Sequence, residues 1–348
     1  MKIEEIYMQR CMELAKQGAG YVAPNPMVGA VLVLGERIIG EGFHKQYGHG
    51  HAEVNCLNSV KNEDEHLIHQ STLYVSLEPC AHFGKTPPCA DMIIQKKIPK
   101  VVIGCRDPFK EVDGKGIEKL LAAGIEVGHG VLEKDCIELN KRFFAFHTKH
   151  RPYIILKWAQ SNNSKIGNTI GERVFISNEF TNRMAHKWRS EEASILVGTN
   201  TALLDNPELS VRLWNGQNPV RLLVDMDLRL PSSLKIFNSN SKTIIFNAIK
   251  HEEINNLLYY QVTHDVSVVH QIVHALYHLK IQSVLVEGGA RLLQSFIDEG
   301  MWDEARVTEN GELIIVNGLD APELTNEKLS DSEKIFSDSI YYYKNLNA

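Results

Sequence analysis

Two short stretches of the sequence carry side chains suited to binding a metal ion. GHGHAEV (48–54) contains His51 and Glu53, and LEPCAHFGKTPPC (77–89) contains Cys80 and Cys89 with eight residues between them. One imidazole and two thiolates make three protein ligands, which leaves a fourth tetrahedral position for water. This donor set predicts a catalytic zinc site, because a closed structural site more often has four protein ligands.

Glu53 stands two residues after His51, at the expected start of a helix, so both side chains can point toward the same end. A carboxylate in that place can take a proton from water and pass it to a leaving amine. We expect Cys89 to begin the next helix, where the N-terminus favours a thiolate, and Pro87 and Pro88 to stiffen the loop. An H-x-E followed by P-C and a second cysteine is typical of zinc nucleobase deaminases.

His49 competes with His51 as the imidazole ligand. Only His51 has the H-x-E spacing to Glu53, so His51 is favoured and His49 is interpreted as a turn residue. The structural alternative assigns Cys80 and Cys89 to packing and His51 to a surface turn.

The length predicts a two-domain protein, since 348 residues exceed the usual size of a single core. A net charge of −6 argues against a nucleic-acid partner. No apolar run is long enough to span a membrane, and the N-terminus has no apolar signal core. Clustered cysteines in such a chain are typical of metal binding in a reducing cytoplasm.

Alternating strands and helices predict an α/β fold throughout. In the first half we expect helices over 3–17, from 52, from 89 and over 114–123, strands over 27–43 (two, around Gly35–Glu36), 71–77, 100–105 and 125–127, and a helix with a linker over 133–150. In the second half we expect strands over 153–158, 193–198, 220–225, 242–247 and 283–287, and helices over 268–279 and 290–299. The polar tail beyond about residue 310 gives no clear pattern before SIYYYKN.

The stretch VEGGARLL (286–293) reads as a strand, a two-glycine turn and a helix. Backbone amides at such a turn can approach a phosphate at the helix N-terminus. Without a full G-x-G-x-x-G pattern the turn alone does not indicate a dinucleotide site.

Longer motifs resemble those of a known family. In the first half these are APNPMVGAVLV, GFH, HAEV, LEPCAHFGKTPPCA and RDP, and in the second half they are LKWAQS, GERVFIS, VGTNTALLDNPELSVR, NPVRLLVDMDLRLP and LVEGGARLLQSF. Together they resemble the bifunctional riboflavin-biosynthesis deaminase/reductase. The resemblance implies a cytidine-deaminase-like α/β/α sandwich over 1–148 and a dihydrofolate-reductase-like α/β domain over 149–348.

The resemblance also implies two reactions and two cofactors. The first domain would use zinc to deaminate 2,5-diamino-6-ribosylamino-4(3H)-pyrimidinone 5′-phosphate, and the second would use NADPH to reduce the ribosyl group to ribityl. The family suggests a homo-oligomer, a dimer or a tetramer.

The family's functional residues transfer to matching positions of this chain. In the deaminase half they imply substrate contacts at Asn25, His44, Lys85 and Asp107. In the reductase half they imply cofactor contacts at Ala159, Phe175, Thr201, Asp205, Gly288, Gly289, Ala290 and Arg291, and substrate contacts at Lys157, Arg189, Leu209, Arg212 and Glu287. Two arginines suit a phosphate, because each guanidinium can bind it bidentately.

The chain departs from the family pattern at three places. Asn163-Ser164 replaces a common Asp-Gly pair, Arg173 and Phe175 replace a serine and a tryptophan, and Phe109 replaces an asparagine. The first two changes fall in the reductase half, so the deaminase chemistry is the firmer expectation.

Two rival functions fit part of the sequence. A zinc deaminase of another base or nucleoside, including tRNA adenosine, would pair the first half with an inactive reductase-like domain. A non-enzymatic zinc protein would have a fourth protein ligand. The pI of about 6.2 argues against an RNA substrate.

Overall fold

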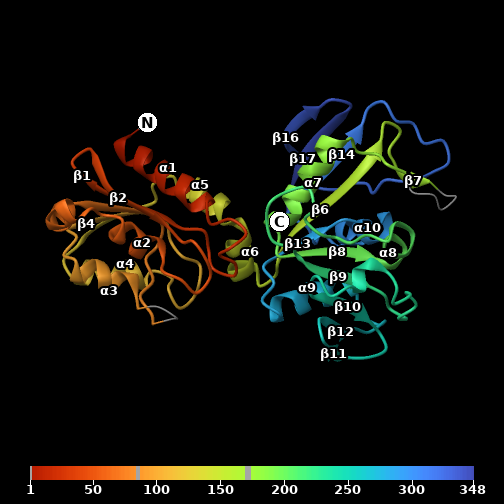
Figure 1. Ribbon diagram of the computed structural model, residues 1–348, viewed down its shortest axis with the longest axis horizontal. Helices are drawn as coiled ribbons and strands as arrows, with labels where there is room; N and C mark the ends of the chain where they lie inside the picture. The colour runs from red at the N-terminus through yellow and green to blue at the C-terminus, as the bar shows by residue number, and fades with distance from the viewer. Residues whose placement is uncertain (1, 84–86, 169–173) are drawn as a thin grey trace. The chain divides into compact units, whose positions relative to one another are not determined.

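The structure, a computed structural model, describes residues 2–83, 87–168 and 174–348. The chain forms two compact units, Met1–His150 and Arg151–Ala348, each built on a β-sheet of its own (Figure 1). Both units are mixed α/β, which confirms the predicted fold class. No helix in the described part of the chain is both long and apolar enough to cross a bilayer.

The first unit contains a five-stranded sheet in the order β2-β1-β3-β4-β5. Its strands are β1 (Gly29–Leu34), β2 (Arg37–Phe43), β3 (Thr72–Leu77), β4 (Lys100–Cys105) and β5 (Glu126–His129). β1 pairs antiparallel with β2 and β3, whereas β3, β4 and β5 are parallel. The carboxyl ends of β3 and β4 therefore reach the same edge of the sheet, where each is followed by a loop.

Helices cover both faces of this sheet. The core residues of α1 (Ile3–Lys16) and α5 (Glu133–Leu139) pack on one face, and those of α2 (Ala52–Asn58), α3 (Cys89–Gln95) and α4 (Lys115–Ala122) pack on the other. A 3₁₀-helix, η1 (Asn62–Gln70), connects α2 to β3. Two glycines permit close packing, because a Cβ on Gly29 would lie 1.9 Å from the Cys11 carbonyl oxygen and one on Gly42 would lie 2.2 Å from the Cys56 nitrogen.

The end of the first unit differs from the sequence prediction. We expected one helix and a linker over 133–150, but α5 is followed at once by a second helix, α6 (Lys141–Lys149). Phe143, Ala145 and Phe146 are buried, so these aromatic residues form a packed helix face rather than a linker.

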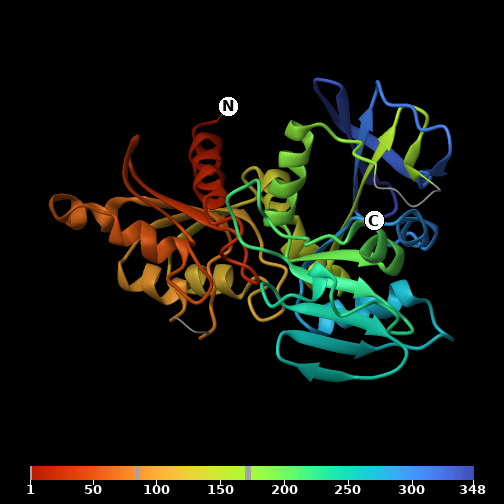
Figure 2. The same cartoon turned by 45° about the vertical axis from the view of Figure 1, so that its right-hand side comes forward.

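The second unit contains a ten-stranded mixed sheet in the order β11-β12-β10-β9-β8-β13-β6-β14-β17-β16. Its strands are β6 (Tyr153–Ser161), β8 (Ser194–Gly198), β9 (Val220–Val224), β10 (Thr243–Asn247), β11 (Glu252–Ile254), β12 (Leu257–Gln261), β13 (Ser283–Val286), β14 (Glu304–Asn310), β16 (Glu327–Ile335) and β17 (Asp338–Asn345). The strands from β12 to β14 in this order are parallel, and β11, β17 and β16 join antiparallel. β10, β12 and β11 lie side by side at one end of the sheet (Figure 2).

Four α-helices pack against this sheet. They are α7 (Glu179–Glu191), α8 (Thr199–Asp205), α9 (Val268–His278) and α10 (Ala290–Asp298). α9 and α10 share the larger core with alternate residues of the central strands, and α8 contributes to a smaller core on the other residues of those strands. The predicted helices at 268–279 and 290–299 are confirmed, whereas α7 and α8 were not predicted.

Three small elements complete the second unit. β7 (Lys165–Asn168) and β15 (Gly318–Asp320) form a separate two-stranded sheet, and η2 (Lys235–Phe237) is a single 3₁₀ turn. The tail that gave no pattern in the sequence thus contributes β15, β16 and β17.

Candidate functional site

His51 and Glu53 lie at the beginning of α2. His51 occupies the N-cap position with extended backbone, and Glu53 falls in the first helical turn. The Glu53 side chain is buried, with the residue only 3% exposed, and it hydrogen-bonds to the Cys89 thiol. His49, the competing ligand, is exposed.

Cys80 and Cys89 approach His51 from the other side. Cys80 lies just beyond the end of β3, and Cys89 is the first residue of α3, as predicted. The Cys89 backbone N–H donates to Cys80 Sγ at 3.4 Å, and the Ala90 N–H donates to the Cys80 carbonyl at 3.1 Å. These two bonds close the base of the loop between the cysteines.

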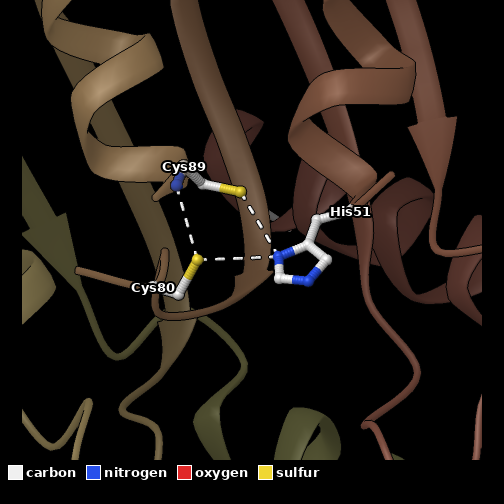
Figure 3. Close-up of side chains that lie close together, drawn as sticks. All are labelled: His51, Cys80 and Cys89. Atoms are coloured by element: carbon white, nitrogen blue, oxygen red, sulfur yellow. Dashed lines mark hydrogen bonds between the residues drawn. The ribbon is translucent and has the colours of Figure 1, made fainter. Parts of the chain in front are cut away.

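The three side chains converge on one point (Figure 3). His51 Nδ1 lies 3.6 Å from Cys80 Sγ and 3.4 Å from Cys89 Sγ, and all three donor atoms lie within 4.8 Å of one another. In a tetrahedral zinc site of ordinary bond lengths, nitrogen and sulfur ligands stand about 3.6 Å apart. The donor set and its spacing therefore fit zinc, and the cluster of mutually close donors contains these three described residues without a fourth.

The surroundings tune the protonation of this cluster. The hydrogen bond from the Cys89 thiol, helped by His51, lowers the pKa of Cys80 to about 4, while the same contact and burial raise the pKa of Cys89. Burial raises the pKa of Glu53, and His51 partly offsets that effect. The carboxyl of Glu53 is thus shifted toward the protonated form, which suits a group that takes up and returns a proton.

Asn25 and His44 lie beside His51. The rings of His44 and His51 meet edge to face at 5.4 Å. His44 Nδ1 lies 3.1 Å from the Gly50 carbonyl, so Nδ1 carries the proton and Nε2 accepts from the Asn25 amide at 3.3 Å. Burial lowers the pKa of His44, which keeps the ring neutral. The structure therefore brings two of the four predicted deaminase substrate contacts next to a predicted metal ligand.

Asp107 follows β4 at the same edge of the sheet. It is 6% exposed, and burial raises its pKa to about 7, with smaller effects from Glu78 and Cys80. Its carboxylate accepts the Phe109 backbone N–H at 2.8 Å. Lys85, the predicted phosphate contact, lies outside the described residues.

Phe109, the third departure from the family pattern, contributes its ring rather than a polar group. The ring lies 6.0 Å from that of His82 and 5.0 Å from that of His147. The substitution therefore places an aromatic contact between the cysteine loop and α6.

Glu78 was not singled out in the sequence. It is 4% exposed, and its carboxylate accepts backbone N–H groups from Asp107, Gly114, Gly116 and Ile117 at 2.9 to 3.3 Å. The sequence did contain one signal for Glu78: it is an acidic residue between an apolar strand and the Pro79-Cys80 pair.

In the second unit, three predicted substrate contacts form one buried charge cluster. Arg189 on α7 makes a bidentate ion pair with Glu287, with nitrogen–oxygen distances of 2.8 and 2.6 Å. Burial would raise the pKa of Glu287, but Arg189 and Lys157 lower it to about 2. Burial also lowers the pKa of Lys157, which Glu287 opposes. The guanidinium fork of Arg189 thus binds a carboxylate here.

Arg212 and Leu209 lie on the loop after α8. Buried Leu209 has a φ of +54°, and Arg212 donates to Ser210 Oγ at 2.9 Å and to Glu208 at 3.1 Å. The Arg212 backbone N–H donates to Nδ1 of His186, a residue that sequence reasoning missed. Burial lowers the pKa of His186 to about 4, so it serves as a neutral acceptor.

Arg212 also lines an open depression on the surface. The depression has a volume of about 570 Å³, and its walls are Arg183, Arg212, Leu213, Trp214 and Asn215. Two guanidinium groups thus lie at this depression, and that of Arg212 pairs with Glu208.

The predicted cofactor turn lies between β13 and α10. Gly288 has a φ of +131° and Gly289 is the N-cap of α10, and the peptide between them is cis. A Cβ on either glycine would lie 3.7 or 3.1 Å from Thr201 Oγ1, so the structure brings Thr201 to this turn. Gly288 is buried, and its carbonyl accepts the Gly198 N–H at 3.0 Å.

The other predicted cofactor contacts are more scattered. Asp205 ends α8, Ala290 begins α10 and Arg291 is exposed. Ala159 lies within β6, and Phe175 is 78% exposed. Their cofactor roles stay predictions.

The comparisons with known proteins cover both units. Residues 1–105 match the family model of the cytidine and deoxycytidylate deaminase zinc-binding region, and residues 152–314 match that of the RibD C-terminal domain. The riboflavin biosynthesis protein RibD of Aquifex aeolicus is 39% identical over 96% of this chain and 94% of its own length. The chain belongs to the RibD family. Escherichia coli RibD, 32% identical with 94% of each chain covered, is a further relative.

Solved RibD structures share the fold of the whole chain. A Thermotoga maritima deaminase/reductase superposes with a TM-score of 0.90 at 36% identity over 99% of both chains, and Acinetobacter baumannii RibD does so with 0.90 at 30% identity over 98% of both. As a RibD, the chain is a bifunctional enzyme of riboflavin biosynthesis with a zinc-dependent deaminase and an NADPH-dependent reductase. This result supports the predicted function over a deaminase fused to an inactive domain.

Asn163 and Ser164, which depart from the usual RibD pattern, are accommodated by hydrogen bonds and backbone conformation within the second unit. Asn163 Oδ1 accepts from Ser161 and from the Ile315 N–H, and its amide donates to the Ile315 carbonyl at 2.9 Å. Ser164 takes the left-handed position, with a φ of +55°, that a glycine would occupy without strain. Arg173, the second departure, lies outside the described residues.

Proposed function

We propose that the chain acts twice on one phosphorylated pyrimidine. The first unit would hydrolyse an amino group of 2,5-diamino-6-ribosylamino-4(3H)-pyrimidinone 5′-phosphate, and the second would reduce the product's ribosyl group to ribityl with NADPH. The description of the Thermotoga maritima relative as a deaminase and a 5-amino-6-(5-phosphoribosylamino)uracil reductase supports both steps. The observation that carries the proposal is the convergence of His51, Cys80 and Cys89 beside buried Glu53.

In the deaminase, His51, Cys80 and Cys89 would hold the metal and Glu53 would carry the proton. Zinc in such a site acidifies its water and supplies hydroxide near neutral pH. Glu53 would carry a proton from the attacking water to the leaving amine, so that oxygen bonds to the ring carbon while the C–N bond breaks and ammonia leaves.

The neighbouring polar groups would orient the substrate. Asn25, held by neutral His44, presents its amide to the pyrimidine edge, and buried Asp107 hydrogen-bonds the ribose hydroxyls. Lys85 is proposed as a phosphate contact on sequence grounds alone.

In the reductase, NADPH supplies the hydride, and the chain binds and orients both molecules. The turn at Gly288 and Gly289, with Thr201 beside it, would receive the dinucleotide phosphate. Lys157 and Glu287 would contact the sugar, since both lie in the same buried cluster. Glu287 binds Arg189 bidentately, through Nε and Nη2, whereas the contacts of Arg212 with Glu208 and Ser210 both involve Nη1. We therefore assign the substrate phosphate to the more exposed Arg212 at the open depression.

A pair of variants in the full chain tests both halves. Glu53→Gln keeps the shape of the side chain, and we expect ammonia release to fall by roughly 10²- to 10⁴-fold, the usual contribution of a general acid–base group. The variant should retain zinc and oxidise NADPH at the wild-type rate when given the deaminated compound.

Lys157→Met should give the opposite pattern, with normal ammonia release and impaired NADPH oxidation. Ammonia release on the diaminopyrimidine phosphate that is unaffected by Glu53→Gln would contradict the deaminase assignment. Wild-type NADPH oxidation by Lys157→Met would contradict the role of Lys157.

The assembly and the compartment are part of the proposal. Exposed aromatic rings of Phe180 and Phe336, which pack 4.8 Å apart, support a self-association surface on the second unit. We propose a dimer or tetramer, which light scattering of the purified chain would measure. Six free cysteines support a reducing cytoplasm.

A further inference from the structure

The carboxylate of Glu78 links a zinc ligand segment to the loop that carries Asp107. One oxygen accepts N–H groups from Asp107 and Gly114 at 3.3 and 3.0 Å, and the other accepts from Gly116 and Ile117 at 2.9 and 3.2 Å. The Glu78 backbone N–H also donates to the Cys105 carbonyl at 3.0 Å, which extends the β3–β4 pairing. A single side chain thus binds both ends of the loop from β4 to α4 and the first turn of α4.

The start of α4 also packs closely against the residues that precede Cys80. Pro79 separates Glu78 from Cys80, and a Cβ on Gly116 would lie 2.0 Å from the Pro79 carbonyl oxygen. The first turn of α4 therefore packs directly on the segment that leads into Cys80. The N–H groups and the helix N-terminus balance the buried charge of Glu78.

We propose that Glu78 is a positioning residue of the deaminase: its carboxylate holds Cys80 and Asp107 in one fixed arrangement. Cys80 follows two residues after Glu78, and the Asp107 N–H is one of the four groups that Glu78 binds. Loss of the carboxylate would loosen the metal ligand and the substrate contact together. The proposal rests on the zinc-dependent deamination proposed for the first unit.

Glu78→Gln is the informative variant, because it keeps the side-chain length but turns an NH₂ group toward backbone donors. Supporting groups behind metal ligands typically contribute 10- to 100-fold to metal affinity. We expect zinc loss to a chelator to be roughly 10-fold faster or more in the full chain, together with a raised deaminase KM. Glu78→Asp, which keeps the charge, should restore part of both properties.

Two controls separate positioning from general stability. Asp64→Asn removes another buried carboxylate of the same unit, which pairs with Arg37 at 2.7 Å. NADPH oxidation by the same chain reports whether the second unit is intact. Zinc retention and KM equal to wild type in Glu78→Gln, with a fall in melting temperature like that of Asp64→Asn, would overturn the proposal.

The zinc measurement needs no substrate. A wrong substrate assignment would therefore leave the expected zinc loss intact, whereas a wrong role for Glu78 would abolish it. If Glu78→Gln unfolds the first unit, zinc loss and deaminase KM are compared between Glu78→Asp and Asp64→Asn. A larger change in Glu78→Asp supports the proposal, and equal values in the two variants would contradict it.

A second observation concerns the surface of α9. His274 and His278 are exposed, lie one turn apart and share a hydrogen bond between their Nε2 atoms, which are 2.9 Å apart. For ordinary metal–nitrogen bonds, two nitrogens at this spacing subtend an angle of about 90° at the ion. A right angle suits the tetragonal coordination of Cu²⁺ and Ni²⁺ better than the tetrahedral coordination of zinc.

We infer that His274 and His278 form a second metal site, which takes a divalent ion of the copper or nickel type. His270 on the same helix face is a matched control, because its Nε2 lies 3.2 Å from a Glu299 oxygen. Ni²⁺ is the probe, since it does not oxidise thiols, and the deaminase site is loaded with zinc beforehand.

Calorimetric titration of the full chain should show one Ni²⁺ bound by the wild type. Either His274→Ala or His278→Ala should weaken that binding by roughly tenfold or more, because each removes one of two ligands. His270→Ala should stay within about twofold of wild type. Unchanged binding in both pair variants, or an equal loss in His270→Ala, would refute the site.

Discussion

At the residue scale, the spacing of metal-binding residue types in the sequence predicted which three side chains come together in the first unit. His51, Cys80 and Cys89 could be selected because few other roles suit an H-x-E followed by two cysteines next to prolines. Glu78 and His186 could not, since an isolated glutamate or histidine carries no pattern. Their roles depend on backbone groups that only the folded chain brings to them.

The buried carboxylate of Glu287 makes the second unit sensitive to acid. Arg189 and Lys157 hold its pKa at about 2, below the ordinary value of 4.5. The stabilisation is therefore fully present above pH 4.5 and is lost as the pH falls toward 2. We expect the free energy of unfolding of the second unit to decline over this window.

Glu287→Gln should flatten that decline. It should also lower the stability at pH 7 by about 3–5 kcal/mol, because it leaves two buried cations unpaired. Urea unfolding at pH 5 and pH 3, followed by tryptophan fluorescence, measures both effects. An unchanged pH slope in the variant would contradict the assignment.

Ser164 offers a test of backbone strain. A non-glycine residue in the left-handed region costs about 1–2 kcal/mol, and glycine costs about 0.5–1 kcal/mol in unfolded-state entropy. Ser164→Gly should therefore raise the free energy of unfolding by about 0.5 kcal/mol. Ser164→Ala, which keeps the strain, should show no gain, and a glycine variant less stable than the alanine variant would count against this explanation.

At the element scale, the sequence predicted the apolar strands and missed the polar elements. In α7, the residues facing the core include Thr181, Ala185 and His186, so the helix shows little apolar periodicity. β16 is exposed along nearly its whole length and exists through its pairing with β17. Neither element has a hydrophobic signal of its own, and tertiary contacts decide its conformation.

The N-cap of α7 should matter for the reductase. The Asn178 side chain accepts from the Phe180 and Thr181 N–H groups and donates to the Ile335 carbonyl at 2.8 Å. Asn178→Ala should lower the free energy of unfolding by about 1–2 kcal/mol. Because α7 carries Arg189 and His186, the reductase KM should also rise.

Ser267→Ala is the matched control, since Ser267 caps α9. It should lose similar stability without changing the reductase kinetics. Kinetics that change equally in both variants would indicate a general rather than a local effect.

At the scale of the whole molecule, each unit has its own buried core, and only the second unit contains tryptophan. The buried clusters of the first unit contain no residue beyond His150 among those described, and all four tryptophans belong to the second unit: Trp158, Trp188, Trp214 and Trp302. Tryptophan fluorescence therefore reports the second unit alone.

Zinc removal should act on one unit only. A ligand present at about 1,000 times its Kd stabilises the folded state by about 4 kcal/mol, so chelation should lower the melting temperature of the first unit and abolish ammonia release. The tryptophan-detected transition, and NADPH oxidation with the deaminated compound as substrate, should stay the same. Loss of NADPH oxidation on chelation would show that the units depend on each other.

The bonds from Cys89 and Ala90 back to Cys80 have a consequence for how such enzymes diversify. The Cys89 N–H binds Cys80 Sγ and the Ala90 N–H binds the Cys80 carbonyl, so the two ends of the intervening segment are tied to each other. The length and composition of the segment can therefore vary while the two sulfur atoms keep their places. Substitutions and insertions in this segment can therefore change which molecule enters the site without changing the positions of the two cysteines.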